Sequence, residues 1–300
     1  MKVIVAGGTG FLGRYITIAL SAAGHEVSVL SRRGDMSGTP QLAAARSIRA
    51  DATKPEALAG RLDGADAVVS AVQLPNYPIE VPRKNLTFDM YDRQATENLI
   101  AEAERAGVTR FVYISGASAD PSAPETWYRA KGRAEETLRA SKLEHAILRP
   151  SWAYGPEDKA LNKFAAIARF SPVVPRIGLR RQLIQPVFVN DIATAVARIF
   201  ERGAWGKTLE IGGPDVMSMD AVIRTMLKVM GKRRLVIPVP APLVKLATVP
   251  LVLLPTPPMT PSGIDFAVQD GLVDTTELEK VLDIHPVPME EGLSMYLGRR

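Results

Sequence analysis

A cluster of glycines between two apolar runs constrains the fold of this chain more than any other sequence feature. Residues 3–33 read VIVAGGTGFLGRYITIALSAAGHEVSVLSRR: an apolar run, the glycines, a stretch with helical apolar spacing and a second apolar run. Glycine permits a tight turn and lets a ligand approach the backbone closely. The pattern therefore predicts a strand, a loop and a helix whose N-terminus can receive a phosphate.

Strand-like runs alternate with helical stretches through the first half of the chain. The runs are short, rich in β-branched residues and bounded by Gly, Asp or Pro, and they lie at 2–6, 26–30, 46–50, 66–72, 110–115 and 145–150. The clearest helix spans 89–108 and has Gly107 as its stop signal. This alternation predicts an α/β fold of the Rossmann type, with a doubly wound parallel sheet.

The regularity fades from about residue 151. Helices are predicted at 187–200, 217–231 and 275–284, and a strand at 207–213, with proline-bearing connections between them. We expect residues 1–150 to form the nucleotide-binding Rossmann domain. Residues 151–300 are expected to form a smaller mixed α/β region, interleaved with that core, that contacts substrate or partner.

Composition narrows the function classes. The chain has 300 residues, 46% of them hydrophobic, and no cysteine, which excludes disulfides and thiolate metal sites. His25, His145 and His285 are too scattered for a metal site, so no metal is expected. The net charge of +5 favours anionic partners, but the basic clusters lack interleaved aromatics, and no nucleic-acid binding is expected. The first apolar run is too short for a secretory signal, so we expect a cytoplasmic location, or one at the inner face of a membrane.

The glycine loop and the end of the second strand-like run indicate the cofactor. Gly7, Gly10 and Gly13 follow the first strand with the spacing G-x-x-G-x-x-G. An NAD site would usually place Asp or Glu at the end of the second strand, where this chain has Ser31, Arg32 and Arg33. Guanidinium groups attract a ribose 2′-phosphate, so NADP(H) is predicted, with NAD(H) less favoured. The alternative for Arg33 is a solvated loop residue.

Six motifs together resemble one protein superfamily. GGTGFLG, ADATKPEAL, TENLIAEAERAGVTRFVYISG, LRPSWAYGP, QPVFVNDIATAV and LEIGGPD occur in the order of the extended and atypical short-chain dehydrogenases/reductases. The chain most resembles the branch that holds the nucleotide-binding accessory subunit of respiratory complex I and its bacterial relatives. The resemblance implies that Asp51 contacts the adenine, that Ala71 and Val72 line the cofactor, and that 149–155 lies near the nicotinamide. The full set of predicted cofactor contacts is Gly7, Thr9, Gly10, Phe11, Leu12, Gly13, Ser31, Arg32, Arg33, Asp51, Ala52, Ala71, Val72, Ser115, Lys131, Pro150 and Trp152.

The catalytic signature of that superfamily, Tyr-x-x-x-Lys with a preceding Ser, is altered here. In ETWYRAKGRAEE the residue four before Lys131 is Trp127, and Tyr128 is three before it. Residues three apart still share a helix face, so Ser115, Tyr128 and Lys131 remain the predicted catalytic residues, with impaired chemistry. Tyr154 is a further phenol that could act there or pack in the core.

The segment 235–259, LVIPVPAPLVKLATVPLVLLPTPPM, is apolar but interrupted by prolines. Its longest predicted helix, 241–254, is shorter than the ~20 residues that a membrane span needs. Three readings stay open: an interfacial segment on an anionic membrane surface, a lid over an apolar substrate, or a core element.

The leading hypothesis is an NADP(H)-binding oxidoreductase-type protein with an apolar, quinone-like or lipid-like substrate. The alternative is a catalytically silent nucleotide-binding redox sensor, assembly factor or structural subunit, which the Trp127 register favours. A sugar-nucleotide epimerase or dehydratase is a third reading, weakened because it needs the same tyrosine.

Overall fold

A computed structural model describes residues 1–298 of the chain. Its centre is a seven-stranded parallel sheet in the order β11-β6-β5-β4-β1-β2-β3. The strands are β1 (Lys2–Ala6), β2 (Glu26–Ser31), β3 (Arg46–Arg49), β4 (Ala67–Ser70), β5 (Arg110–Ile114), β6 (Glu144–Pro150) and β11 (Lys207–Ile211). The strand order reverses at β1, where β2 and β4 are its two neighbours. The predicted Rossmann fold, with its doubly wound parallel sheet, is confirmed.

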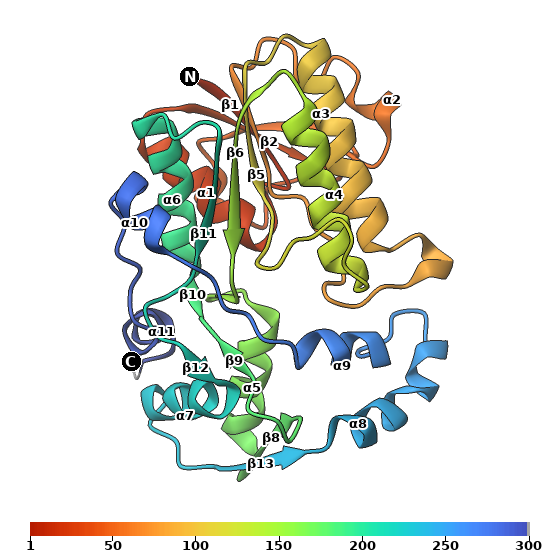
Figure 1. The fold of residues 1–300 in the computed structure, drawn as a ribbon, viewed down its shortest axis with the longest axis vertical. Coiled ribbons are helices and arrows are strands. Elements are labelled where there is room, and N and C mark those ends of the chain that lie inside the picture. The colour runs from red at the N-terminus through yellow and green to blue at the C-terminus, as the bar shows by residue number, and fades with distance from the viewer. Residues whose placement is uncertain (299–300) are drawn as a thin grey trace.

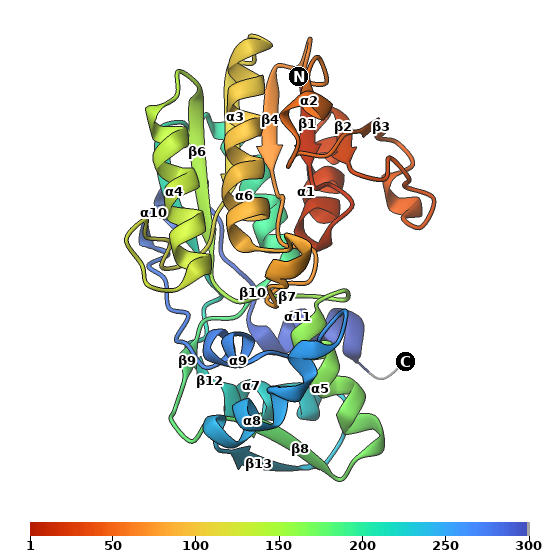
Figure 2. The ribbon, with the colours of Figure 1, turned by 90° about the vertical axis from the view of Figure 1, so that its right-hand side faces the viewer.

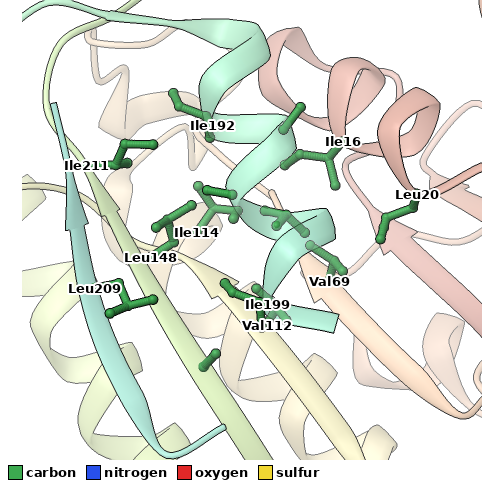
Figure 3. Packing of buried hydrophobic residues seen from close by; sticks show 14 of the residues in the cluster. Ile16, Leu20, Val69, Val112, Ile114, Leu148, Ile192, Ile199, Leu209 and Ile211 are labelled. Carbon is green, nitrogen blue, oxygen red and sulfur yellow. The ribbon is translucent and has the colours of Figure 1, made fainter. Parts of the chain in front are cut away.

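Helices cover both faces of this sheet (Figures 1 and 2). One face carries α1 (Phe11–Ala22), α6 (Val189–Arg202) and α10 (Thr276–Leu282), and the other carries α2 (Pro55–Leu58), α3 (Ala95–Arg105) and α4 (Thr126–Ala140). Figure 3 shows Ile16 and Ile199, from α1 and α6, packed over Val69, Val112 and Leu148 of the strands. Burying each such side chain contributes about 1.5–3 kcal/mol, so this core fixes the strands whose ends form the site.

The chain after residue 150 enters both parts of the molecule. Its strand β11 joins the sheet, and its helices α6 and α10 pack against one face of it. The remainder forms a smaller unit, here called the C-terminal lobe. The lobe contains β7 (Ala153–Tyr154), α5 (Lys159–Phe170), β8 (Val173–Ile177), β9 (Leu183–Ile184), β10 (Val187–Phe188), β12 (Met217–Ser218), α7 (Met219–Val229), β13 (Leu235–Val239), α8 (Ala241–Thr248), α9 (Pro261–Ala267) and α11 (Met289–Leu297). It lies beyond the carboxyl ends of the parallel strands (Figures 1 and 2).

The helix predicted over 89–108 is present but begins with wider turns. Residues Asp89–Gln94 form a π-helical segment, η3, which continues into α3. Asp92, in this segment, is fully buried and accepts a hydrogen bond from the backbone N–H of Leu74 at 3.1 Å. Such π-helical segments occur frequently at functional sites.

The proline-rich segment 235–259 forms a strand, a short helix and a single turn. β13 pairs in parallel with β8, α8 follows it, and the turn η4 covers Pro250–Leu253. The helix predicted over 241–254 ends as an α-helix at Thr248, because Pro250 cannot donate a backbone hydrogen bond. No helix within residues 1–298 has the length and hydropathy needed to cross a membrane.

Candidate functional site

The glycine loop between β1 and α1 is tightly packed. Gly7 has a φ of +79°, and a Cβ added there would lie 2.6 Å from the carbonyl oxygen of Ala71. A Cβ on Gly13 would lie 2.2 Å from the carbonyl oxygen of Gly7. Gly10 is the N-cap of α1, and no side chain in the described part of the chain caps this helix, so the N–H groups of its first turn stay open to a ligand. This loop, with Thr9, Phe11 and Leu12 at the helix start, is suited to hold a pyrophosphate.

Arg14 lies at the same loop and was missed by the sequence reasoning. Its guanidinium reaches the carbonyl oxygens of Gly10 and Thr9 at 3.4 Å each, and it forms an ion pair with Glu157 at 3.1 Å. Tyr15 donates to the same carboxylate at 2.7 Å. Arg14 is the fourth residue of α1. A cation near a helix N-terminus interacts unfavourably with the helix dipole unless an anion lies nearby. An arginine at this position of FLGRY is therefore the sequence signal that could have identified this residue.

The end of β2 presents the predicted arginines. Arg32 lies over the Tyr91 ring, 5.2 Å from its centroid, and donates to the Tyr91 hydroxyl at 2.9 Å. Ser31 is buried and accepts from the N–H of Gly34 at 3.1 Å, while Arg33 is exposed. Tyr91 thus holds the Arg32 guanidinium in one place, which lowers the entropy lost when it binds an anion.

The predicted adenine-side and strand-end residues lie along the same edge of the sheet. The Asp51 carboxylate accepts from the backbone N–H and hydroxyl of Thr53, at 3.1 and 2.8 Å. Ala52 is buried beside it, and Ala71 and Val72 follow β4 next to the glycine loop. Pro150 ends β6, and the carbonyl of Trp152 accepts from the N–H of Val187 at 3.0 Å.

Lys131 is buried among groups of the protein itself. Its ammonium lies 3.1 Å from an oxygen of Asp92 and donates to the carbonyl oxygen of Ile114 at 3.0 Å. It also lies 5.1 Å from the centroid of the Tyr113 ring. Burial raises the pKa of Asp92, and the Lys131 charge opposes that rise. The ammonium is therefore paired with a carboxylate, and its role towards a ribose stays a prediction.

Within the described residues 1–298, neither Ser115 nor Tyr128 forms a hydrogen bond with Lys131. The Ser115 hydroxyl donates to Glu135 at 2.5 Å, and this fully buried carboxylate also binds Arg149 at 2.7 Å. Burial, together with the charges of Glu125 and Asp270, raises the pKa of Tyr128 to about 12. A neighbouring ammonium would lower that pKa, so the environment of Tyr128 differs from that of an activated tyrosine.

Aromatic side chains gather where β5 ends. Trp127 lies 5.0 Å from Tyr128, 5.3 Å from Phe266 and 6.2 Å from Tyr77, measured between ring centroids. A Cβ added to Gly116, just after β5, would lie only 2.3 Å from the indole ring. The indole N–H is buried and has no acceptor within the described part of the chain. These four rings, here called the aromatic cluster, lie on the half of the sheet edge where a dinucleotide places its nicotinamide.

The other candidates have structural surroundings. Tyr154 is fully buried in the lobe and donates to the carbonyl of Met289 at 3.5 Å, which agrees with its packing alternative. His25 packs against Phe200, and the His145 ring lies 3.0 Å from the carbonyl of Leu143. No group of three metal-ligating side chains occurs in residues 1–298.

Comparisons with known proteins identify the nucleotide-binding family. A family model described as NAD(P)H-binding matches residues 7–171. The mitochondrial NADH dehydrogenase [ubiquinone] 1 alpha subcomplex subunit 9 of Arabidopsis thaliana is 29% identical over 82% of the chain and 62% of its own length. The ceramide reductase of Caulobacter vibrioides is 28% identical over 80% of the chain and 74% of its own length. The chain thus spans under two thirds of the plant subunit.

Solved structures show the same fold. The UDP-glucuronic acid 4-epimerase of Bacillus cereus superposes with a TM-score of 0.76 at 18% identity, covering 99% of both chains. The family model covers more than half of this chain and includes the glycine loop, α3 and α4. The chain therefore belongs to the NAD(P)H-binding family.

Proposed function

We propose that this protein is an NADP(H)-dependent reductase-type protein that acts on an apolar, quinone-like substrate without a tyrosine acid. The observation that carries the proposal is the contrast between two halves of the sheet edge. The glycine loop is packed so closely that no Cβ fits at Gly7 or Gly13, as a pyrophosphate cradle requires. The Lys131 ammonium, by contrast, is committed to Asp92 and Ile114.

The choice of NADP(H) over NAD(H) rests on Arg32. Its guanidinium follows β2 and is oriented by Tyr91, and this chain has no carboxylate in the three residues after Leu30. An NAD site would use such a carboxylate on the ribose 2′-hydroxyl, whereas a guanidinium binds a 2′-phosphate through charge-assisted hydrogen bonds.

Replacing Arg32 with alanine should remove most of the preference for NADPH over NADH. A hydrogen bond to a charged group contributes about 1.5–3 kcal/mol, so NADPH should bind about 10–100-fold more weakly while NADH affinity stays nearly constant. Calorimetric titration of both cofactors measures this. Arg61→Ala, at an exposed arginine before β4, is the matched control. Equal affinities for both cofactors in the unmutated protein would contradict the assignment.

The substrate class follows from the missing acid. Bound NADPH supplies a hydride, so the remaining requirement is a proton for the reduced product. A ketone becomes an alkoxide, which needs a positioned acid, whereas a quinone becomes a phenol-like product with a pKa near that of tyrosine, about 10. Water can protonate that product. The Trp127 N–H, which has no acceptor within residues 1–298, is a donor suited to hold a substrate carbonyl without giving up its proton.

A second candidate is the silent nucleotide-binding protein. Trp127 occupies the register of the catalytic tyrosine, and Gly116 is shaped to its ring. The plant relative is a subunit of NADH dehydrogenase by name, while the Caulobacter relative is a reductase by name. Because relatives of both kinds are found, the silent nucleotide-binding protein is the second candidate beside the reductase.

NADPH oxidation against a panel of quinones and apolar ketones separates the two candidates. For the reductase we expect turnover with quinones and little with ketones. Tyr128→Phe should leave quinone turnover nearly unchanged, and Trp127→Phe, which keeps a ring but removes the N–H, should raise the KM for the quinone. Tight NADPH binding without any turnover would support the silent candidate. Ketone turnover that Tyr128→Phe lowers by about 10²–10⁴-fold would show that Tyr128 is a working acid and contradict the proposal.

A further inference from the structure

Exposed apolar side chains concentrate along one stretch of the C-terminal lobe, which begins at the end farthest from the sheet with β13 and continues through α8 to the turn at 250–254, where Arg83 contacts Leu254. β13 and α8 lie along this end in both views of the ribbon (Figures 1 and 2). Phe170 is 90% exposed, Leu253 80% and Leu246 71%. Monomeric soluble proteins rarely expose large contiguous apolar patches, and such patches mark interaction surfaces. The apolar face, as named here, comprises Phe170, Leu235, Ile237, Leu243, Leu246, Val249, Val252, Leu253 and Leu254.

The register of β8 and β13 extends this face. In this parallel pair Leu235 is opposite Val173, Ile237 is opposite Pro175 and Val239 is opposite Ile177. Alternate residues of a strand share one side, and Val236 and Val174, between them, are buried against the lobe. The outward side of this two-stranded sheet is therefore wholly apolar. α8 begins two residues after β13 and continues the face through Leu243 and Leu246.

Positive charge surrounds the apolar face. Residues 159–190 and 221–264 contain 12 of the 37 Lys and Arg residues and no Asp or Glu, and Asp158, Asp191, Asp220 and Asp265 flank these ranges in the sequence. Arg234 donates to the carbonyl of Ala168 at 2.9 Å, which brings the GKRR sequence beside Phe170. Arg180, Arg224, Lys228 and Lys245 form ion pairs. The other eight cations of this set, among them Arg169, Arg181, Lys232 and Arg233, have no ion pair within residues 1–298.

We propose that the apolar face docks onto the surface of an anionic lipid bilayer. Leucine and valine side chains would enter the boundary between headgroups and acyl chains, and the unpaired cations would contact lipid phosphates. A second copy of this chain fits the face poorly. A two-fold contact through this face would bring the cations of both copies together, with no acidic residue from 159–190 or 221–264 to pair them.

Sedimentation of the full chain with lipid vesicles tests the proposal. Vesicles of phosphatidylcholine alone are compared with vesicles of equal parts phosphatidylcholine and phosphatidylglycerol, each at low and high salt. The protein should pellet with the anionic vesicles and be released by salt. Lys232→Ala and Arg233→Ala should each lower the partition coefficient about fivefold, because a basic residue near such a surface contributes about 1 kcal/mol.

Two further variants separate apolar insertion from charge attraction. Leu243→Asp with Leu246→Asp should lower binding at least about tenfold. Met295→Asp, at a side chain 57% exposed on α11 and outside the face, is the matched control and should bind normally. NADPH affinity should be unchanged in all variants, which keeps this test independent of the proposed reductase activity.

Three outcomes would overturn the proposal. The protein would stay in the supernatant with both vesicle types at low salt, or it would bind both types equally without any effect of the Lys232 and Arg233 changes. In the third, sedimentation equilibrium would show a dimer that Leu243→Asp with Leu246→Asp dissociates, and vesicles would bind neither form. That result would assign the face to a second copy.

Discussion

Gly13→Ala should abolish tight NADPH binding while leaving the chain folded. The added methyl would lie 2.2 Å from the Gly7 carbonyl oxygen and 2.7 Å from Gly8 Cα, so α1 must move away from the loop. The N–H groups of the first turn of α1 would then no longer point towards the pyrophosphate. Losing two hydrogen bonds to a charged group, at about 1.5–3 kcal/mol each, predicts a drop in affinity of at least about 100-fold.

Calorimetric titration measures this loss, and circular dichroism monitors the fold. Overpacking of this kind destabilises by about 1–3 kcal/mol, which a domain of this size tolerates. Gly38→Ala is the matched control, because a Cβ on Gly38 meets no atom of residues 1–298 within 4 Å. A Gly13→Ala protein that binds NADPH as tightly as Gly38→Ala would show that the dinucleotide does not use this loop.

Lys131→Met should destabilise the fold strongly. The change leaves the Asp92 carboxylate fully buried without its counter-charge, and breaking a buried ion pair in this way costs about 3–5 kcal/mol. Chemical denaturation at neutral pH measures the loss in the free energy of unfolding. Lys142→Met, at an exposed lysine, should have little effect.

The pH dependence gives this prediction a second readout. Burial raises the pKa of Asp92, and removing Lys131 raises it further, so the folded variant binds a proton that the unfolded chain lacks. The loss in the free energy of unfolding is therefore complete when the pH is above the pKa of Asp92 in the folded variant. It shrinks as the pH falls towards the pKa of an aspartate in the unfolded chain, about 3.9. Asp92→Asn with Lys131→Met should recover most of the stability. A Lys131→Met protein of normal stability that has lost NADPH affinity would instead assign the ammonium to the cofactor.

The parallel sheet with its flanking helices and the glycine loop could be predicted from the sequence because each depends on local patterns. Short β-branched runs, and glycines placed after one of them, carry their own structural signal. The partners of Lys131 could not be predicted in this way. Asp92 lies 39 residues earlier, in a segment that reads as ordinary helix, and only the packing of η3 against α4 brings the two charges together.

The arrangement of the C-terminal lobe was also difficult to predict, because it depends on contacts between residues far apart in the sequence. The apolar run at 235–259 could be a lid, a core element or a membrane contact, and residue types alone do not distinguish these. Pairing between β8 and β13 decides which side chains face outward, and that pairing joins residues about sixty positions apart. For Trp127 the sequence shows part of the answer. Its position four residues before Lys131 can be read from the sequence, but its close packing against Gly116 cannot.

The segment that carries the apolar face also reaches the aromatic cluster from its other side. Phe266 of α9 lies 5.3 Å from both Tyr77 and Trp127, Gln269 donates to Glu125 at 3.2 Å, and Arg83 donates to the carbonyl of Leu254. One continuous stretch of chain thus carries the apolar face that we propose docks onto a bilayer and also Phe266 of the aromatic cluster. Thermodynamic reciprocity then requires that any tightening of ligand binding by the bilayer be matched by an equal tightening of bilayer binding by the ligand.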